Sequence, residues 1–321
     1  MITFNVDPEL NPILSALKDV WGDTAMDLSD LGAARQMHNA MSEQRNATAT
    51  VTEGVESSRR TIANTDTGLE VVIYLHQPIE HCDFARSALL HIHGGGFVTG
   101  SAAHAEPQLR ELAKRFNCVV VSVDYRLAPE HPFPAALYDC LAALQWLHSA
   151  AASLNVDPNK ITVLGESAGG GLAAGLSLYV RDHSHIDIAQ QILLYPMLDY
   201  RNVAAASDGH QDNIIWSRTN NKIGWDAYIG EGVDDIMLAY ASPTYAQELH
   251  NLPPTYLCVG DIDLFYQENL DYIQRLRDAG GNAQIDVYAG AYHAFQVVMP
   301  DASVSQKCLQ NLDNVLTQAL T

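Results

Sequence analysis

The feature that most constrains this chain is a serine flanked by glycines, Ser167 in the run Gly165-Glu166-Ser167-Ala168-Gly169. The residues before it, 160–164, are largely β-branched and apolar and predict a buried strand. The residues after it, 170–179, are rich in Ala and Leu and contain no proline, which predicts a helix. On a strand–turn–helix, a G-x-S-x-G run indicates a nucleophile elbow, in which a tight turn lifts the serine hydroxyl clear of the sheet. Outside that context, the same run could be a glycine-rich turn with an idle serine.

Strand-like and helix-like segments alternate from about residue 50 to the end of the chain. Two early strands, near residues 60–63 and over 69–75, are expected to be antiparallel. Further strands are predicted at 88–92, 118–123, 160–164, 188–195, 255–259 and 283–288, and helices at 106–116, 135–151, 170–179, 268–279 and 304–319. Such alternation predicts an α/β fold with a mostly parallel, eight-stranded sheet and helices on both faces.

Two segments stand outside this alternation. Residues 1–45 carry two amphipathic helical patterns, and residues 199–235 hold a polar stretch followed by a helix-like pattern over 216–228. We expect both segments to form a helical cap over a catalytic core made of residues 46–198 and 236–321. A helical extension packed on the core explains residues 1–45 equally well.

Composition excludes several classes of partner. The net charge of −20, from 38 acidic and 18 basic residues, argues against binding to nucleic acid or to an anionic membrane surface. The apolar runs are shorter than the roughly 18 residues that a spanning helix needs. The start, Met1 to Leu10, does not resemble a signal peptide. Five cysteines without close pairs predict a reduced, cytoplasmic protein that has no disulfide.

A nucleophilic serine needs hydrogen-bond donors for the oxyanion that develops when it attacks a carbonyl. The run His93-Gly94-Gly95-Gly96-Phe97 follows the predicted strand 88–92. Consecutive glycines leave their N–H groups free to point at one place, and no side chain blocks the approach of a substrate. We therefore expect the N–H groups of Gly95, Gly96 and Ala168 to be the donors. A merely flexible glycine loop is less favoured, because this run follows a core strand.

The serine also needs a base and an acid, and in this architecture they follow it in the order acid, then histidine. Asp261 and Asp263 lie just past the predicted strand 255–259, and His293 lies just past 283–288. Functional loops of such sheets follow the strand ends, so His293 is the expected general base. This reasoning does not show which of the two aspartates is the acid, because residues two positions apart point to the same side of an extended strand (the same strand parity).

Two histidine pairs, His91-x-His93 and His183-x-His185, have a spacing that metal ligands can show. No matching carboxylate or cysteine cluster accompanies either pair, so we expect no metal site. Catalysis by a serine nucleophile requires no cofactor, and none is expected.

After about residue 45 the chain resembles the bacterial hormone-sensitive lipase family of α/β-hydrolases. The matching motifs occur in the family's order: His93-Gly94-Gly95-Gly96-Phe97, Asp124-Tyr125-Arg126-Leu127-Ala128-Pro129-Glu130, Gly165-Glu166-Ser167-Ala168-Gly169-Gly170, Leu252-Pro253-Pro254, Asp263-Leu264-Phe265 with Glu268, and His293-Ala294-Phe295. The resemblance implies an α/β-hydrolase fold with a helical cap. It places the catalytic acid on Asp263, with Asp261 as the alternative, and it implies that residues 124–130 brace the oxyanion loop.

The chain departs from the family pattern at three points. Glu166 precedes the nucleophile where many members carry aspartate. Tyr266 and Gln267 stand where the acid loop usually has a basic and an acidic residue. Ala294 replaces the glycine that usually follows the catalytic histidine, and its β-carbon is expected to affect rate more than mechanism.

The resemblance implies a carboxylesterase that hydrolyses short- to medium-chain esters, with a small-molecule ester as its partner and a homodimer expected only by analogy. Ser167 would attack the carbonyl, His293 would move the proton, and Asp263 would orient the imidazole. Five aromatic residues are candidates for an acyl pocket, although core packing explains each equally well: Trp21, Phe97, Tyr195, Trp216 and Trp225. A lipase, deacetylase, amidase or acyltransferase would use the same machinery. A non-catalytic receptor is disfavoured, because the three catalytic residues are retained.

Overall fold

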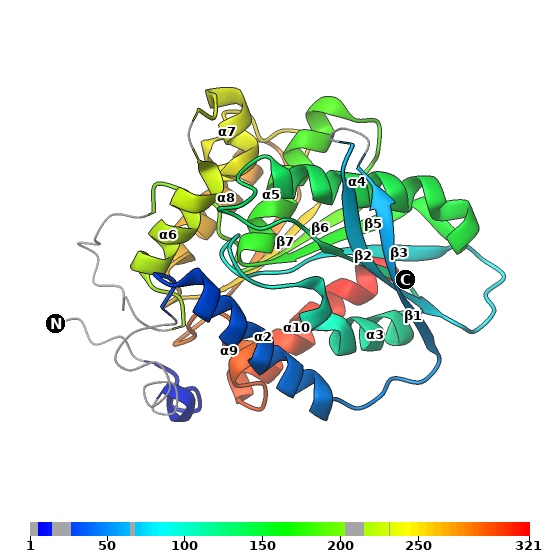
Figure 1. Cartoon of the computed structure of the whole chain (residues 1–321), viewed down its shortest axis with the longest axis horizontal. Coiled ribbons are helices and arrows are strands. Elements are labelled where there is room, and N and C mark those ends of the chain that lie inside the picture. Colours follow the sequence, from blue (N-terminus) through cyan, green and yellow to red (C-terminus); the bar gives the residue numbers. More distant parts are fainter. Residues whose placement is uncertain (1–5, 15–26, 65–67, 203–214, 231) are drawn as a thin grey trace.

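The computed structural model of the 321-residue chain describes residues 6–14, 27–64, 68–202, 215–230 and 232–321. Its centre is one eight-stranded sheet in the order β1-β2-β4-β3-β5-β6-β7-β8, drawn in Figure 1. β2 is antiparallel to both of its neighbours, and all other pairs are parallel. The predicted mostly parallel sheet is therefore confirmed. The strands are β1 Val55–Ala63, β2 Glu70–Pro78, β3 Arg86–Ile92, β4 Val119–Asp124, β5 Val156–Glu166, β6 Gln190–Leu194, β7 Thr255–Gly260 and β8 Ala283–Tyr288.

Helices cover both faces of the sheet. The α-helices are α2 Leu31–Thr48, α3 Glu106–Arg115, α4 Ala135–Ala150, α5 Ala168–His183, α6 Arg218–Ile229, α7 Asp235–Ala241, α8 Tyr266–Asp278, α9 Phe295–Val298 and α10 Ser303–Leu320. Short 3₁₀ helices are η1 Ala102–Ala105, η2 Ala151–Leu154 and η3 Pro243–Tyr245. α3 and α10 pack on one face, and α4, α5 and α8 pack on the other (Figure 1).

The central strands are buried on both faces, which explains why they read as continuous apolar runs rather than as alternating patterns. All seven residues of β3 and all six of β7 are buried. The strand order reverses around β3, which has β4 on one side and β5 on the other. Ligands of such sheets bind outside the carboxyl ends of the strands at this switch point. The loops after β3 and β5 carry the glycine run and the elbow, so the topology brings these two motifs together.

Two helices from outside the main alternation pack against the loop that follows β3. α2 reaches it through Arg35, whose Nε donates to the Val98 carbonyl at 2.7 Å. α6 reaches it at Gly224, where an added Cβ would lie 2.7 Å from the Gly96 carbonyl oxygen. Most of the first amphipathic pattern, with Trp21, and residues 203–214 of the predicted insertion lie outside the described residues. Both predicted cap segments thus contribute a helix beside the candidate site.

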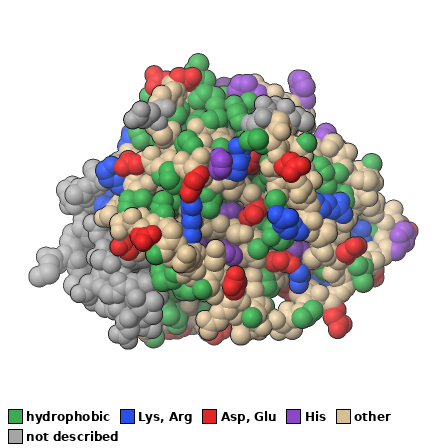
Figure 2. Space-filling model, in the orientation of Figure 1, with side chains coloured by type: hydrophobic (Ala, Val, Ile, Leu, Met, Phe, Trp, Pro, Cys, Tyr) green, Lys and Arg blue, Asp and Glu red, His purple; other side chains and the backbone are tan. Residues whose placement is uncertain are grey.

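The surface mixes charges of both signs. Acidic and basic side chains are interspersed over the face in Figure 2. All five cysteines are buried and carry free thiols. Among the described residues, no helix combines the length and the apolar character needed to cross a bilayer.

Candidate active site

Ser167 lies at the turn between β5 and α5, as the glycine-flanked run predicts. Its backbone has φ 53° and ψ −119°, a conformation that non-glycine residues rarely adopt. The turn is tight enough to exclude side chains from its flanks. A Cβ added at Gly165 would lie 2.1 Å from the Gly169 carbonyl oxygen, and one at Gly169 would lie 2.1 Å from that of Ile92. Both glycines are therefore required by close backbone packing.

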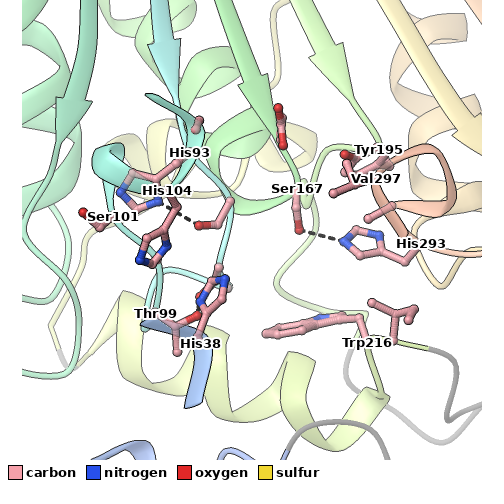
Figure 3. Close-up of a pocket in the computed structure, with 18 of the residues that line it drawn as sticks. His38, His93, Thr99, Ser101, His104, Ser167, Tyr195, Trp216, His293 and Val297 are labelled. Carbon is pink, nitrogen blue, oxygen red and sulfur yellow. Dashed lines mark hydrogen bonds between the residues drawn. The ribbon is translucent and has the colours of Figure 1, made fainter. Parts of the chain in front are cut away.

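Three side chains predicted from the sequence meet in one hydrogen-bonded chain. His293 Nε2 lies 3.0 Å from Ser167 Oγ, and His293 Nδ1 lies 2.9 Å from Asp263 Oδ2. The serine and histidine of this chain are labelled in Figure 3. All three residues are buried, with 7% (Ser167), 1% (Asp263) and 6% (His293) of their surface exposed. Because a carboxylate only accepts, Nδ1 donates to Asp263 and leaves Nε2 as the acceptor for the serine hydroxyl.

The structure separates the two aspartates that strand parity leaves equivalent. Asp263 faces the imidazole, and its other oxygen, Oδ1, accepts from the Phe265 N–H at 2.9 Å. Asp261 points elsewhere, because its Oδ1 accepts from the Gly290 N–H at 2.7 Å in the loop after β8. Asp261 therefore ties two loops together, while Asp263 contacts His293.

Aromatic edges and a strained backbone fix the orientation of the imidazole. The rings of Tyr195 and Phe265 meet the His293 ring edge-on, with centroids 4.9 Å and 5.1 Å away. Tyr195 is fixed in turn, because its hydroxyl accepts from Gln296 Nε2 at 2.8 Å. The next residue, Ala294, has φ 57° and ψ 26°. This left-handed conformation suits glycine better than alanine, which explains in physical terms why glycine is usual there.

The glycine loop lies beside the serine, because Gly95 and Gly96 line the same cavity as Ser167. Gly95 has φ 125° and Gly96 has φ 60°. A Cβ at Gly95 would lie 2.2 Å from the Thr99 carbonyl oxygen, and one at Gly96 would lie 2.2 Å from Trp216. Within the described part of the chain, neither glycine N–H donates a hydrogen bond. Ala168 begins α5, and the first N–H groups of a helix have no partner inside it.

Residues 124–130 hold the glycine loop in place, as the resemblance implies. The Tyr125 hydroxyl donates to the His93 carbonyl at 2.8 Å, and its ring stacks on the His93 imidazole. The Ala128 N–H donates to the Phe97 carbonyl at 3.0 Å. The run is itself anchored by Arg126, which forms an ion pair at 2.8 Å with the buried carboxylate of Asp139.

A cavity of about 240 Å³ opens in front of Ser167. Tyr195 and Trp216, two of the predicted pocket residues, line it (Figure 3). Phe97 and Trp225 do not line it, so the expectation that these two residues form an acyl pocket is wrong. The φ of 67° at Phe97 turns its ring into the core, where it stacks on Tyr228 at 3.9 Å and packs against Trp225 at 5.0 Å. Trp21 lies outside the described residues.

Glu166, one of the departures from the family pattern, also lines the cavity. Its Oε1 lies 3.8 Å from His91 Nε2, while His91 Nδ1 is hydrogen-bonded to Ser122 Oγ at 2.8 Å. Both ring nitrogens of His91 are therefore occupied with protein groups, whereas in His93 only Nδ1 is paired, with the Gly94 carbonyl oxygen at 2.8 Å. Among the described residues, no group of three potential metal ligands is brought together.

Two lining residues were not identified from the sequence, and Glu268, which was named only as part of the acid-loop motif, has a supporting role that the structure shows. His38 and His104 line the cavity from α2 and η1, although nothing in their local patterns distinguishes them from other polar positions. Glu268 supports the acid loop from within. Its Oε1 accepts from the Leu198 N–H and its Oε2 from Asn202 Nδ2, both at 2.7 Å. Burial raises the pKa of Glu268 well above its ordinary value.

The comparisons with known proteins identify the family of the chain. Residues 89–297 match the family described as α/β hydrolase fold. An arylesterase of Saccharolobus solfataricus is 32% identical, over 70% of this chain and 73% of its own length. Esterase LipI of Mycobacterium tuberculosis is 34% identical, over 67% of this chain and 68% of its own.

Solved structures extend the similarity over almost the whole chain. A bacterial heroin esterase superposes with a TM-score of 0.90 at 33% identity, covering 98% of both chains. Esterase LipW from Mycobacterium marinum superposes with a TM-score of 0.84 at 30% identity, covering 98% of this chain and 96% of its own. On these matches, the chain belongs to the α/β-hydrolase family of carboxylesterases.

Proposed function

We propose that this carboxylesterase hydrolyses short- to medium-chain esters through an acyl-enzyme formed on Ser167. His293 is the general base and acid, Asp263 orients it, and the oxyanion donors are the N–H groups of Gly95, Gly96 and Ala168. The observation that supports this most strongly is the buried chain of contacts from Ser167 Oγ to His293 Nε2 at 3.0 Å and from His293 Nδ1 to Asp263 Oδ2 at 2.9 Å.

Acylation begins when Ser167 Oγ attacks the ester carbonyl carbon and passes its proton to His293 Nε2. The carboxylate of Asp263 holds the imidazole in the tautomer that can accept this proton, and it stabilises the imidazolium that results. The carbonyl oxygen becomes an oxyanion and accepts hydrogen bonds from the three N–H groups. Removing one such donor typically lowers the turnover rate by about 10²- to 10³-fold.

Collapse of the tetrahedral intermediate breaks the bond to the leaving alcohol. The imidazolium of His293 gives its proton to the departing oxygen, so the alcohol leaves neutral and Ser167 remains acylated. Water then attacks the acyl-enzyme, with His293 again taking a proton. The second intermediate collapses, the proton returns to Ser167 Oγ, and the carboxylic acid is released.

The size of the cavity supports a preference for short acyl chains. Its volume of about 240 Å³ lies below the range of about 300–1,000 Å³ that is typical for drug-sized ligands. Trp216 limits it on one side, with its Nε1–H held by Asn221 Oδ1 at 3.1 Å. We expect activity to fall steeply from four-carbon to sixteen-carbon acyl esters. Preferential turnover of emulsified long-chain esters would instead identify a lipase.

Replacement of the nucleophile tests the proposed function directly. The variant Ser167→Ala should lose turnover by about 10⁴-fold or more, together with the burst of released alcohol, because no acyl-enzyme can form. Ser153→Ala is the matched control, since Ser153 is exposed on η2, away from the cavity. Circular dichroism should show that both variants are folded. Unchanged turnover in a folded Ser167→Ala protein would refute the proposal.

A further inference from the structure

A group of imidazoles forms the side of the cavity that lies across from His293. Figure 3 shows His38, His93 and His104 on one side of Ser167, with His293 on the other. His38 comes from α2, and His104 comes from η1. Their rings meet edge to face with centroids 4.9 Å apart. We call His38 and His104, which both line the cavity, the imidazole wall.

Most of the imidazole nitrogens of this region lack protein partners, the exception being His93 Nδ1, which is hydrogen-bonded to the Gly94 carbonyl at 2.8 Å. The Nδ1 atoms of His38 and His104 are buried without a hydrogen bond, and so is Nε2 of His93, whose residue is only 6% exposed. Within the described ranges, the Nε2 atoms of His38 and His104 form no hydrogen bond with the protein either. Most buried polar groups in proteins are paired, so unpaired imidazole nitrogens in residues that line a cavity call for an explanation.

The imidazole wall is held in place by contacts that do not use its rings. Arg45 of α2 donates to the His104 carbonyl at 2.9 Å, and Asn46 donates to the Ala103 carbonyl at 2.9 Å. These bonds fix η1 against α2, so the two rings keep their relative positions. A preorganised site of this kind loses little entropy when it binds a ligand.

The protonation of the wall indicates which chemical group it suits. Burial lowers the pKa of His38 to about 4 and also lowers that of His104, so both rings are neutral near pH 7. A neutral imidazole has one donor and one acceptor nitrogen. A hydroxyl group also donates and accepts, and it can pair with either tautomer. A hydrocarbon chain would leave the nitrogens unpaired, and the net charge of −20 disfavours anionic substrates.

We propose that the imidazole wall binds a hydroxyl group on one arm of the ester, so that the preferred substrates are hydroxylated esters. The inference rests on the proposed function, because it assumes that the reacting carbonyl sits at Ser167. With the carbonyl there, one arm of the ester extends toward α2 and η1, where His38 and His104 lie beside Ser101 and Gln108. The hydroxyl then exchanges hydrogen bonds with the Nε2 atoms of the wall, because the Nδ1 atoms are buried.

Matched ester pairs test this proposal, because each pair replaces one hydroxyl by a methyl group. Hydroxyethyl butyrate against propyl butyrate examines the alcohol arm, and ethyl ω-hydroxyhexanoate against ethyl heptanoate examines the acyl arm. For one of the two pairs, we expect kcat/KM to be about tenfold higher for the hydroxylated member, mainly because its KM is lower. This is the factor that one net hydrogen bond supplies. A water-filled wall that does not recognise substrate would give no preference in either pair, and that result would overturn the proposal.

Variants of the wall assign the preference to its residues. His38→Leu and His104→Leu should each bring the ratio of the favoured pair close to one, whereas His104→Gln, which keeps a donor and an acceptor, should retain part of it. His81→Leu is the matched control, because the His81 side chain is 88% exposed and is not among the cavity-lining residues. A preference that survives both leucine variants would overturn the proposal. Hydrolysis of the plain esters by the unaltered protein reports separately on the proposed function.

Discussion

At the scale of single residues, the site depends on backbone conformations that the sequence indicates only in part. Ser167 and Ala294 both have positive φ values, 53° and 57°, on either side of the reacting atoms. Such conformations cost about 1–3 kcal/mol each and persist only where the surroundings impose them. The glycines around Ser167 make its turn recognisable in the sequence. Local pattern does not mark Ala294, and only the glycine that the family usually has at this position points to the left-handed backbone that the structure shows.

The identity of the acid is another residue-scale question that local pattern could not decide. Asp261 and Asp263 follow the same strand with the same parity, and only the resemblance favoured Asp263. The structure shows why they differ, since a turn closes with the Asp263 N–H donating to the Gly260 carbonyl at 3.2 Å. That turn directs Asp263 to His293 and leaves Asp261 to bind the Gly290 N–H.

Amide substitutions at the two aspartates should therefore have unequal effects. Asp263→Asn removes the charge that orients and stabilises the imidazolium, and we expect kcat to fall by about 10³- to 10⁴-fold. Asp261→Asn keeps an oxygen that can accept from Gly290, so a loss of less than about tenfold is expected. Steady-state kinetics on one short-chain ester measures both. Equal losses in the two variants would contradict the assignment of Asp263.

Adding one methyl group to the glycine loop tests the oxyanion donors. In Gly96→Ala the new Cβ would lie 2.2 Å from the Trp216 ring, and φ is 60°. The loop must shift, so its N–H groups would move away from the oxyanion, and we expect kcat to fall by about 10²-fold or more. Gly280→Ala is the control, because φ there is also positive, at 81°, but a Cβ meets nothing within 4 Å. Similar kinetics for the two variants would argue against a role for this loop.

At the scale of elements, the alternation of strand-like and helix-like segments predicted the core strands and helices well, but it predicted the short helices poorly. The predicted helix over 170–179 begins earlier, at Ala168, because the glycines at 169–171 pack against backbone that leaves no room for side chains. Their low helix propensity is overridden by this close packing. α7, which packs on α5, was missed although Asp234 caps it by accepting from the Met237 N–H at 2.8 Å. Seven residues are too few for a periodic pattern to stand out.

One contact between elements couples the N-terminal helix to the site. Arg35 of α2 pairs with Glu130 at 2.7 Å and donates to the Val98 and Ala128 carbonyls. The hydrogen bond with Arg35 lowers the pKa of Glu130 to about 2. The partners lie far apart in sequence, so no local pattern could reveal this link. It holds α2 against the glycine loop, which we propose as the source of the oxyanion donors.

Breaking this link should loosen the site without removing a reacting group. In Arg35→Met the three acceptors lose their donor, and we expect kcat/KM to fall by about tenfold, which is less than for a misplaced catalytic residue. Hydrogen exchange of residues 94–99 should become faster at the same time. The control Arg59→Met changes an exposed arginine of β1. Unaltered exchange and kinetics in Arg35→Met would show that α2 does not support the loop.

At the scale of the whole molecule, buried histidines make stability depend on pH. Burial lowers the pKa of His38, His76 and His93 to about 4, from an ordinary value of 6.5. As the pH falls below 6.5, the unfolded chain binds protons that the folded chain does not bind. Unfolding is therefore favoured progressively between pH 6.5 and 4. The stability that these neutral rings contribute is fully present only above pH 6.5, the pKa of histidine in the unfolded chain.

His76 allows this effect to be measured away from the site. It is fully buried between β1 and β4, with Nδ1 bonded to Ser57 Oγ at 2.8 Å. Its share of the stability lost between pH 7 and 5 is about 2 kcal/mol. Urea unfolding gives the free energy of unfolding at pH 7 and at pH 5. The difference between these two values should be smaller in His76→Met than in the unaltered protein, by about 2 kcal/mol. An identical difference in both proteins would exclude His76 as a contributor.

The sequence predicted the α/β architecture because strand-like and helix-like segments alternate along the chain. Each of these segments can be recognised from its own residues. It could not predict which aromatic residues line the cavity. Phe97 and Trp216 are both large apolar residues beside the glycine loop, yet one is turned into the core and the other faces the substrate space. The imidazole wall was equally hidden, because His38 and His104 meet only after α2 packs on η1.

The central claim is that Ser167 is the nucleophile activated by His293, and covalent labelling tests it most directly. An activated aryl phosphonate ester should react once per chain and inactivate the enzyme, with peptide mass spectrometry placing the adduct on Ser167. His293→Ala should slow this labelling strongly, since the hydroxyl would lose its base. An adduct on a different residue, or full inactivation with Ser167 unmodified, would contradict the account.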